Sequence, residues 1–549
     1  MTTDIVSQEQ AQQYLTQGYW DQTIQLDYLY RHAHESPERE KLADSRKRLT
    51  FAEVVKSVNR LALKFHELGV RLGDRVGIQL PLCVDSHLVS LAVQAVGAVT
   101  VHLHLRSREL DWVHLLEATE AVAMVIPAQT GDFDFRAMAE GLRKRYPSAK
   151  HIFVSGGEAR PGTIALEDVF GEDLESKYAP DFINSLRAEP GKPWTIMSSS
   201  GTTGVPKFTV VSSYPSMFIS RSLAQRFGMN ATDVALIISP GGPGGSVASP
   251  AGVVGAKIVF LERFEPESAL EAAQREKATI IAGTATQFIK MVDVDNIKQR
   301  YDLSSLRMVT NAAASLPVEI AQRVEQQLGT RVMNIYGTTD AGIPASTSLE
   351  DSSAAAIRSA GKPLPGVEVK IVDEEGNEVS VGEVGEIIWR GPCMYGGYYR
   401  NPSLNKTKYK SGWYFSGDLG SLDKQGYLTL SGRKDHTINR GGQKISPVEI
   451  EECLYQHPKV KEVAVVPMPD RLLGQKACAY VIPREGEIFT FEEMIQFLKA
   501  QGIAVYKLPE RLEIVDQFPV TGGIPRVMKK SLIEDITRKL SEEGARNGI

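Results

Sequence analysis

Cysteine is scarce in this sequence of 549 residues, which contains four cysteines and no C-x-x-C pair. Cys83, Cys393, Cys453 and Cys478 are far apart, a spacing that excludes a disulfide scaffold or a zinc site built from neighbouring residues and is typical of a reducing compartment. An excess of positive charge is also lacking, because 62 Lys and Arg stand against 67 Asp and Glu and give a formal net charge of -5. This balance excludes binding to nucleic acid through bulk charge.

Long hydrophobic runs are absent as well. The most apolar long window, 88–101, is interrupted by Ser90, Gln94 and Gly97, so we predict a buried helix that runs into a strand there rather than a membrane span. The first ten residues, MTTDIVSQEQ, are polar and acidic and do not resemble a secretory signal. We therefore expect a cytoplasmic enzyme that has neither a membrane nor a nucleic acid as its partner.

The chain has no repeat of fixed period, and its texture changes along its length. From about residue 50 to 260, and again through ATIIAGT, LRMVTNAAA and RVMNIYG, helical stretches alternate with short apolar runs, which predicts α/β layers with largely parallel strands. After Gly361 short β-rich segments with glycine turns follow, and near Asp435 a new αβ unit begins. We predict an α/β fold with a large N-terminal domain (1–434) of α/β lobes plus a β-rich subdomain, and a small mobile α+β C-terminal domain (435–549).

Individual elements can also be placed. The periodic stretch 51–69 predicts a helix that ends at Gly69, and RVGIQL at 75–80 predicts a strand. Near the end of the chain a helix is expected to begin at Pro447, and KEVAVVPMP at 461–469 reads as a strand.

The strongest local signal is the run SSSGTTGVPK at 198–207. Small hydroxyl residues and glycines let backbone N–H groups approach a polyphosphate, and a lysine at the end adds a point charge. The spacing is not that of a Walker A loop, which needs G-x-x-x-x-G-K-[ST]. Taken alone, the run could also be a surface turn, as could the glycine run GGPGGS at 241–246. The nucleotide-binding candidates here are Ser199, Ser200, Thr202, Thr203 and Lys207.

Four further motifs follow in order: NIYGTTD at 334–340, GWYFSGDL at 412–419, GRKD at 432–435 and GGQKISP at 441–447. Together with the phosphate-loop run, they resemble the adenylate-forming superfamily of acyl- and aryl-CoA synthetases, adenylation domains and luciferases. The resemblance covers nearly the whole chain in order and spacing. YWDQ near the start and the unbroken NRGGQKI resemble the stand-alone aryl-acid ligases most closely.

The resemblance implies a role for each motif. Tyr336 would stack on adenine, Asp418 would accept hydrogen bonds from both ribose hydroxyls, and Arg433 would donate to the ribose. Thr339 would hold the phosphate and Asp340 would help to bind Mg²⁺ as an oxygen ligand. The family usually has Glu at this last position, so the reach is one methylene shorter here. Each residue alone has a structural alternative: a core tyrosine, a turn cap or a surface ion pair.

The family's small C-terminal domain rotates between a pose that forms the acyl-adenylate and a pose that admits a thiol. The resemblance implies that Asp435 is the hinge and that Gly441 and Gly442 line the tunnel of the pantetheine thiol. Gly441 and Lys444 of the same motif are candidate catalytic residues. An ordinary turn remains an alternative at the hinge and at the glycines.

The sequence departs from the family near its end, where P-x-x-x-x-G-K normally supplies a lysine that neutralises charge during adenylation. In FPVTGGIPRVMKK, counting forward from Pro519 puts Pro525 at the lysine position, and counting back from the basic pair at Lys529 puts Arg526 there. Neither register supplies a lysine. Arg526 is thus a catalytic candidate that keeps the charge without the compact ammonium group. The alternatives are that Arg526 does the lysine's work or that Lys529 swings in.

The acyl pocket is expected to depart as well, since aryl-acid ligases have a His-Asn pair where this sequence has glycines. No asparagine is available for an ortho-hydroxyl, which disfavours 2,3-dihydroxybenzoate and salicylate, and the glycine-rich wall leaves room for a bulkier acid. A pocket reshaped by loop movement is the alternative. Three alanines replace the usual Gly-Gly-Ala floor, and either shift the adenine or narrow the pocket. The candidate pocket residues are Ser213, Pro243, Gly244, Gly245, Ala312, Ala313 and Ala314.

These losses predict an acyl-CoA synthetase that forms a thioester from a bound acyl-adenylate and coenzyme A, releases AMP and is impaired in adenylation. In this it resembles the non-adenylating acyl-CoA ligase of platensimycin-type biosynthesis, which implies a role in natural-product pathways. A complete two-step ligase that uses ATP, and an inactive AMP-binding scaffold, are the alternatives. The expected cofactors are AMP or the acyl-adenylate, ATP in the two-step case, coenzyme A and Mg²⁺. The expected partners are a bulky carboxylic acid or its adenylate, CoA or a carrier-protein pantetheine, and a separate adenylating ligase.

Overall fold

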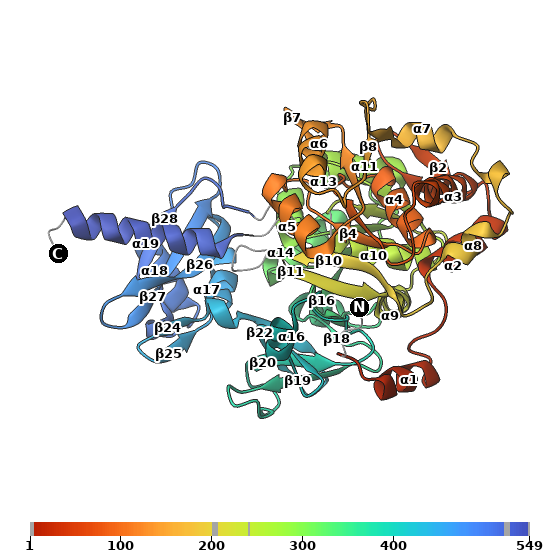
Figure 1. Cartoon of the computed structure of the whole chain (residues 1–549). Helices are drawn as coiled ribbons and strands as arrows, with labels where there is room; N and C mark the ends of the chain where they lie inside the picture. The colour runs from red at the N-terminus through yellow and green to blue at the C-terminus, as the bar shows by residue number, and fades with distance from the viewer. Residues whose placement is uncertain (1–4, 200–206, 240–241, 521–526, 547–549) are drawn as a thin grey trace.

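The structure is a computed structural model, and it describes residues 5–199, 207–239, 242–520 and 527–546. Figure 1 shows a large part, built on three sheets and their helices, and a smaller lobe that contains the last sheet and the end of the chain. The first helix of the large part, α1 (Gln8–Thr16), lies at its periphery.

The first large sheet has seven strands in the order β11-β10-β4-β3-β5-β8-β9. All neighbours in it are parallel except β10 and β11, which are antiparallel. This confirms the parallel α/β layers that the sequence predicts. The strands are β3 (Arg75–Ile78), β4 (Val99–His102), β5 (Ala123–Pro127), β8 (His151–Ser155), β9 (Ile164–Ala165), β10 (Pro193–Ser199) and β11 (Lys207–Ser212). The helices between them are α3 (Phe51–Glu67), α4 (Val84–Ala95), α5 (Glu109–Thr119), α6 (Phe135–Arg145), α7 (Leu166–Gly171) and α8 (Phe182–Leu186), and a small hairpin is formed by β6 (Gln129–Thr130) and β7 (Phe133–Asp134).

The second large sheet has nine strands in the order β18-β17-β16-β15-β14-β12-β13-β1-β2. Its strands are β1 (Glu40–Ala43), β2 (Arg48–Thr50), β12 (Val234–Ile237), β13 (Lys257–Phe260), β14 (Ile280–Gly283), β15 (Met308–Asn311), β16 (Arg331–Thr338), β17 (Gly342–Ser346) and β18 (Lys362–Pro363). Its helices are α9 (Ser213–Arg226), α10 (Gly242–Val253), α11 (Pro266–Glu276), α12 (Ala285–Val292), α13 (Ile297–Arg300), α14 (Val318–Leu328) and α15 (Ser353–Arg358). The adjacent carboxyl ends of β12, β14, β15 and β16 form the edge at which open α/β sheets bind ligands.

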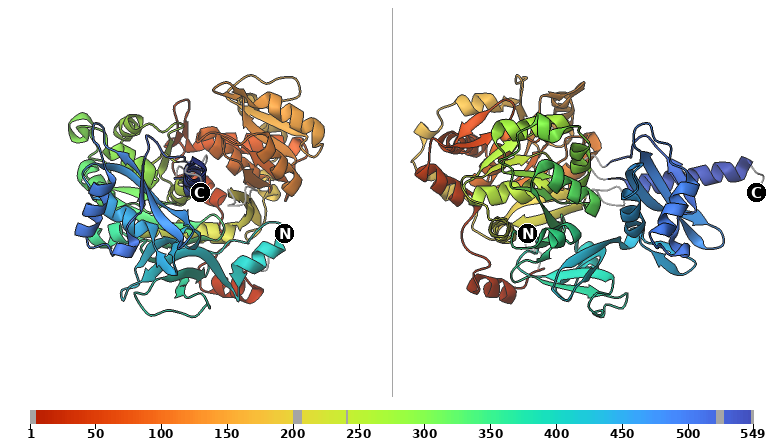
Figure 2. Two further views of the ribbon diagram at one scale, coloured as in Figure 1. Left: turned by 90° about the vertical axis from the view of Figure 1, so that its left-hand side faces the viewer. Right: turned by 180° about the vertical axis from the view of Figure 1, so that it is seen from behind.

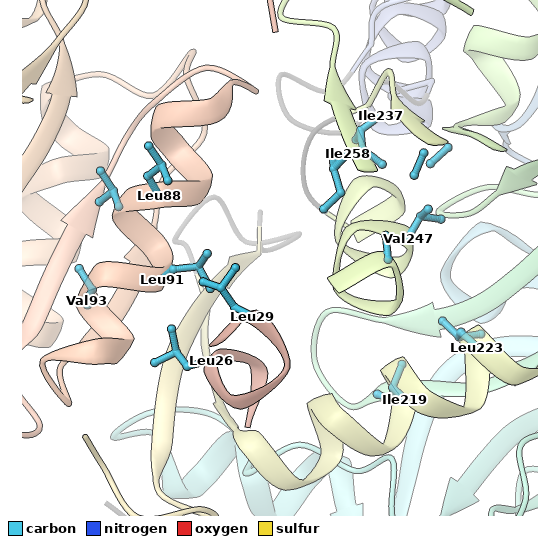
Figure 3. Packing of buried hydrophobic residues seen from close by; sticks show 14 of the residues in the cluster. Leu26, Leu29, Leu88, Leu91, Val93, Ile219, Leu223, Ile237, Val247 and Ile258 are labelled. Atoms are coloured by element: carbon cyan, nitrogen blue, oxygen red, sulfur yellow. The ribbon is translucent and has the colours of Figure 1, made fainter. Parts of the chain in front are cut away.

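One apolar core joins the two large sheets. Helix α2 (Gln25–Glu35) contributes Leu26 and Leu29, and the apolar window read from the sequence contributes Leu88 and Leu91 from α4. Figure 3 shows these side chains facing residues of α9, α10, β12 and β13 across the core. The window is thus the predicted buried helix followed by a strand. In the part of the chain that the structure describes, no helix is both long enough and apolar enough to cross a membrane.

Local signals set the ends of the predicted elements. Thr50 caps α3, because its hydroxyl accepts from the N–H of Glu53 and the carboxylate of Glu53 accepts from the N–H of Thr50. Gly69 follows the helix with a φ of 85°, the left-handed conformation in which glycine ends helices.

The β-rich part predicted after Gly361 is a five-stranded antiparallel sheet, in the order β19-β20-β22-β21 with β23 beside β22. Its strands are β19 (Glu368–Val372), β20 (Gly385–Arg390), β21 (Tyr409–Lys410), β22 (Trp413–Leu422) and β23 (Leu428–Arg433), and α16 (Pro402–Lys408) precedes β21. Between β20 and α16, the segment 396–399 pairs with β11 of the first large sheet through three main-chain hydrogen bonds of 2.7 to 2.8 Å. The β-rich sheet is thereby tied to the strand that follows the phosphate-loop run.

The smaller lobe is an α+β unit, as predicted. Its sheet has the order β25-β24-β27-β26 with β28 beside β27. The elements are β24 (Ile438–Arg440), β25 (Gln443–Ile445), α17 (Pro447–Tyr455), β26 (Val460–Asp470), β27 (Gly474–Pro483), α18 (Phe491–Ala500), β28 (Arg511–Ile514) and α19 (Lys529–Arg546). It has two apolar clusters, one under α17 and α18 and one under α19. Figure 2 shows the lobe beside the large part, with α19 directed away from it. The boundary at 434/435 stays a prediction.

Candidate active site

Three predicted nucleotide-binding residues meet in one connected group. Tyr336 lies near the end of β16, Asp418 on β22, and Arg433 at the end of β23, where the strand register sets it opposite Asp418. The Tyr336 hydroxyl donates to Oδ2 of Asp418 at 2.8 Å. The other carboxylate oxygen of Asp418, Oδ1, lies 3.0 Å from Nη1 of Arg433. Burial, and then the Asp418 carboxylate, hold the pKa of Tyr336 well above its usual value, so the phenol stays a donor.

This group fits a nucleoside through its carboxylate. An ionised carboxylate offers about four acceptor positions, so a carboxylate oxygen that pairs with Tyr336 or Arg433 can also accept from a ribose hydroxyl. The ring of Tyr336 is only 7% exposed and packs edge-on against Trp389, with centroids 5.9 Å apart. Tyr336 is therefore a core residue as well as a member of the group, and its stacking on adenine stays a prediction.

Asp340 stands in a cluster of tyrosines that sequence reasoning missed. The Tyr398 hydroxyl donates to Oδ2 of Asp340 at 2.7 Å, and the Tyr409 hydroxyl donates to the main-chain oxygen of the same residue at 2.8 Å. Tyr414 contacts Tyr409, with centroids 5.1 Å apart. The only signal in the sequence is the dense run MYGGYY at 394–399, which no nucleotide motif accounts for.

The carboxylate of Asp340 is a suitable ligand for Mg²⁺ when the other ligands come from the nucleotide and from water. Magnesium is commonly held by one or two carboxylates together with water and substrate phosphates. Within the described ranges, no group of three or more His, Cys, Asp or Glu side chains gathers that could hold a metal by itself. A single carboxylate that shares the ion with nucleotide phosphates is therefore the mode that Asp340 fits. Thr339 stands beside it in the same turn after β16.

The phosphate-loop candidates are only partly visible. Ser200, Thr202 and Thr203 lie outside the described residues, and Ser199 is placed only as the last residue of β10, paired in register with Lys207. Lys207 begins β11, and its Nζ lies 5.9 Å from the centroid of the Tyr398 ring. The structure thus brings Lys207 close to the tyrosine that holds Asp340.

The predicted pocket residues divide into two groups. Ser213 is buried at the start of α9, where its hydroxyl accepts from the N–H of Gly191 at 2.9 Å, so the hydroxyl serves the packing of the chain. Pro243 and Gly244 lie in the first turn of α10. Gly245 follows them and is exposed, and a Cβ built there would meet no atom within 4 Å. The roomy pocket wall expected from the sequence stays a prediction.

The alanine floor follows β15. Ala312 is buried, whereas Ala313 has a φ of 73°, in the left-handed region that side chains with a Cβ rarely adopt. The side-chain amide of Asn311 donates to the main-chain oxygen of Ala314 at 2.9 Å and so closes the turn. Glycine would adopt this conformation without strain, so Ala313 is a strained residue in the predicted floor of the pocket.

The candidates of the smaller lobe lie apart from this group. Gly441 and Gly442 form the turn between β24 and β25 with φ values of 57° and 91°. Lys444 of the same hairpin forms an ion pair with Glu374, on the turn after β19. Asp435 follows β23 in a short 3₁₀ helix; its carboxylate is 56% exposed and 3.7 Å from Nη2 of Arg433. Neither the hinge nor the tunnel is tested by this arrangement.

Near the end of the chain, where the family's lysine is expected, Lys529 is the candidate that lies among the described residues. Arg526 lies outside the described residues. Nζ of Lys529 lies 2.6 Å from Oε1 of Glu451, and both side chains are largely buried. The same Oε1 accepts from the N–H of Val465 at 2.6 Å. In this structure Lys529 is therefore held by α17 and β26.

Comparison with known families identifies the class. The family model of the AMP-binding enzymes matches residues 29–399, and that of the AMP-binding enzyme C-terminal domain matches residues 449–523. The chain belongs to the AMP-binding enzyme family, and the predicted membership of the adenylate-forming superfamily is confirmed. It is a ligase-family protein of the kind that adenylates acyl or aryl acids.

Individual relatives extend over the whole chain. Pyochelin synthase PchD of Pseudomonas aeruginosa is 34% identical over 542 residues, which cover 96% of this chain and 95% of that protein. A 2,3-dihydroxybenzoate-AMP ligase of Bacillus subtilis is 31% identical over 538 residues, 97% of each chain. The crystal structure of the anthranilate CoA ligase AuaEII with anthranoyl-AMP has a TM-score of 0.85 at 24% identity and covers 94% of this chain and 98% of that one. The predicted architecture, a large N-terminal and a small C-terminal domain, is thereby confirmed.

Proposed function

We propose that the chain activates a bulky carboxylic acid with ATP and Mg²⁺ as its acyl-adenylate and transfers the acyl group to the thiol of coenzyme A or of a carrier-protein pantetheine. The observation that carries this proposal is the connected group of Tyr336, Asp418 and Arg433, which presents a fixed carboxylate and a cation to one nucleoside. Asp340 and Lys207, which both contact Tyr398, supply a metal ligand and a phosphate charge near it.

The transfer step needs positioning more than it needs an added charge. The thiol sulfur attacks the acyl carbonyl carbon, the C–S bond forms, and the C–O bond to the phosphate breaks. AMP leaves with the bonding electron pair, and the thiol proton passes to solvent. Because the adenylate is already activated, correct placement of the two reactants supplies most of the rate.

The substrate class follows from the pocket. The open space at Gly245 supports an acid larger than a single ortho-hydroxylated ring. A polar pair for an ortho-hydroxyl is missing from the sequence at this wall. We therefore propose that the substrate is a bulky aryl or polycyclic acid rather than dihydroxybenzoate or salicylate.

We further propose that the lobes divide at 434/435 and turn about Asp435. The hairpin that carries Gly441, Gly442 and Lys444 rests on Glu374 in the present structure. The thiol tunnel would form when this hairpin leaves Glu374 and faces the nucleoside group. The position of Asp435 directly after β23 suits a hinge, since hinges occur at the ends of elements.

A second candidate is favoured by one specific observation, the absence of a lysine from the segment 519–526. Lys529 does not supply the charge in this structure, because it pairs with Glu451. In this candidate the adenylation half-reaction is impaired, and the chain takes a preformed acyl-adenylate from a separate ligase and performs only thioester formation. The nucleoside group serves both candidates equally.

Two half-reactions measured side by side decide between them. Pyrophosphate release is measured with ATP, Mg²⁺ and a panel of bulky acids, and thioester formation with the matching synthetic acyl-adenylates and CoA. Pyrophosphate release supports the two-step ligase, and thioester without pyrophosphate supports the second candidate. Absence of both products, together with AMP binding by the natural chain, would contradict both candidates and leave an inactive AMP-binding scaffold.

A further inference from the structure

The tyrosine cluster around Asp340 invites an explanation, because buried phenols are costly unless their hydroxyls are used. Tyr398 is 1% exposed, yet its hydroxyl reaches a carboxylate oxygen rather than a main-chain group. In the structure the phenol therefore donates its proton to the hydrogen bond with the Asp340 carboxylate.

The main chain of Tyr398 is itself fixed from two sides. The amide oxygen of Asn405 accepts from the N–H of Tyr398 at 2.7 Å, and its amide nitrogen donates to the Tyr398 carbonyl at 3.2 Å. Opposite, Tyr398 forms an antiparallel bridge with Thr209 on β11. The donor is thus anchored both to α16 and to the strand that Lys207 begins.

We propose that Tyr398 is a positioning residue, which fixes the rotation of the Asp340 carboxylate so that it reaches the divalent cation held on the phosphates of the bound nucleotide. The inference rests on the proposed function, since it assumes that Asp340 is a ligand of that cation. The aspartate side chain of Asp340 is one methylene shorter than glutamate, so fewer of its rotamers bring a carboxylate oxygen to the cation. The hydrogen bond from Tyr398 to Oδ2 excludes rotamers in which the carboxylate points away from the cation. Partners of this kind in the second shell of metal sites typically change metal affinity by 10–100-fold.

The chain offers a matched control within the same cluster. Tyr409 also donates to Asp340, at 2.8 Å, but to its main-chain oxygen rather than its carboxylate. Tyr398 is buried and Tyr409 is partly buried, and each loses only a hydroxyl when replaced by Phe. A role in packing or in holding the turn predicts similar effects of the two replacements, whereas orientation of the carboxylate predicts an effect of Tyr398→Phe alone.

The experiment measures metal binding rather than turnover. Mn²⁺ binding to the full-length protein with a non-hydrolysable ATP analogue is followed by the loss of the free-ion signal in electron paramagnetic resonance. We expect Tyr398→Phe to weaken Mn²⁺ binding by about 10-fold and Tyr409→Phe to leave it within about twofold. Asn405→Ala removes the hydrogen bonds to the main chain of Tyr398 but keeps the Tyr398 hydroxyl. It should therefore weaken Mn²⁺ binding less than Tyr398→Phe does. AMP binding without metal should be unchanged in all three variants.

A double-mutant cycle tests the reason for the arrangement. Asp340→Glu restores the missing methylene, so Tyr398→Phe should cost less in the Asp340→Glu background than in the natural chain. Equal effects of the two Phe variants, or no effect of Tyr398→Phe, would overturn the inference. The proposed function fails separately: Mn²⁺ binding that Asp340→Asn leaves unchanged would remove Asp340 from the metal site, and failure of the natural chain to bind AMP would remove the nucleoside site.

Discussion

Ala313 shows what a single Cβ costs at this site. Its φ of 73° places it in the left-handed region, where an L-residue is disfavoured by about 1–2 kcal/mol. Strain of this kind concentrates at binding sites and persists because the surrounding structure imposes it. Here the hydrogen bond from Asn311 to the carbonyl of Ala314 closes the turn around the strained residue.

Replacing this alanine tests the strain directly. We expect Ala313→Gly to raise the free energy of unfolding by about 0.5 kcal/mol, because relief of the left-handed penalty exceeds the added freedom of the unfolded chain. The measurement is urea unfolding followed by fluorescence. Ala312→Gly is the control, since Ala312 is buried and has no positive φ, and it should lower stability by about 1 kcal/mol. A loss of stability in Ala313→Gly would contradict the strain.

Lys41 is a buried lysine outside the candidate active site. Its Nζ donates to the main-chain oxygen of Ala256 at 2.5 Å, and burial, followed by the charge of Arg39, lowers its pKa to about 7. The unfolded chain should titrate near 10.4. Between these values the unfolded state binds more protons than the folded state, so the free energy of unfolding rises with pH across this window.

The lowered pKa of Lys41 predicts how the free energy of unfolding changes with pH. Lys41→Met removes the titrating group, so the stability of the variant relative to the natural chain should be highest at pH 7 and below and should fall as the pH rises toward 10. Urea unfolding at pH 7 and pH 9 measures the difference. Lys277→Met, at an exposed position after α11, should show no such trend. A stability difference that does not change with pH would show that Lys41 stays charged in the folded state across this range, and would contradict the lowered pKa.

At the scale of elements, an ion cluster ties α11 to two strands of the nine-stranded sheet. Glu276 at the end of α11 is 3% exposed; it receives two hydrogen bonds from Arg48 on β2, at 3.0 and 2.8 Å, and one from Lys257 on β13 at 2.8 Å. The hydrogen bonds from Arg48 are the largest cause that holds the pKa of Glu276 below its usual range. The cluster therefore stabilises the fold at neutral pH and weakens as the carboxylate is protonated in acid.

Removing the buried charge should be costly. We expect Glu276→Gln to lower the free energy of unfolding by about 3 kcal/mol, since Arg48, Lys257 and Arg275 lose a common partner. The control is Glu267→Gln on the same helix, whose pair with Arg300 is exposed and should be worth less than about 1 kcal/mol. Thermal unfolding of both variants at pH 7 measures the contrast. Similar small losses in both would show that the buried cluster contributes little.

The sequence predicts some elements better than others, for physical reasons. Helix α3 and strand β26 follow from periodicity and caps within their own residues. The pairing of β1 with β13 joins residues more than 200 positions apart, and nothing local in four residues specifies that partner. Tyr336, Asp418 and Arg433 could be found because each stands in a motif. Tyr398 could not, because its role depends on which carboxylate the fold brings to its hydroxyl.

At the scale of the whole molecule, polar contacts hold the smaller lobe against the large part. Nη1 of Arg484 lies 3.5 Å from Asp293, Lys444 pairs with Glu374, and Tyr455 packs against apolar clusters of both parts. Beside these contacts a cleft of about 660 Å³ opens between α12–α14 and the smaller lobe. Contacts of this kind beside an open cleft are compatible with the proposed rotation of the lobe.

The pair between Lys444 and Glu374 gives a test at this scale. We expect Glu374→Gln to raise the rate of thioester formation relative to pyrophosphate release, by up to about fivefold, because an exposed ion pair is worth at most about 1 kcal/mol. The gain should shrink in high salt, which already weakens the pair in the natural chain. Glu378→Gln, whose pair with Lys370 lies within the β-rich sheet, is the control and should change neither rate. Equal behaviour of the two variants would contradict a role in lobe position.

The contact between β11 and the segment 396–399 has a consequence for solubility. Strand β11 is the terminal strand of its sheet, and Phe208, Val210 and Val211 make it apolar. A terminal strand with unpaired main-chain groups is a template for association with other chains. Here the three hydrogen bonds between β11 and 396–399 occupy that side. A chain truncated before residue 396 would therefore expose the unpaired main-chain groups at the edge of β11. Fragments of the large part should aggregate unless they retain the segment 396–399.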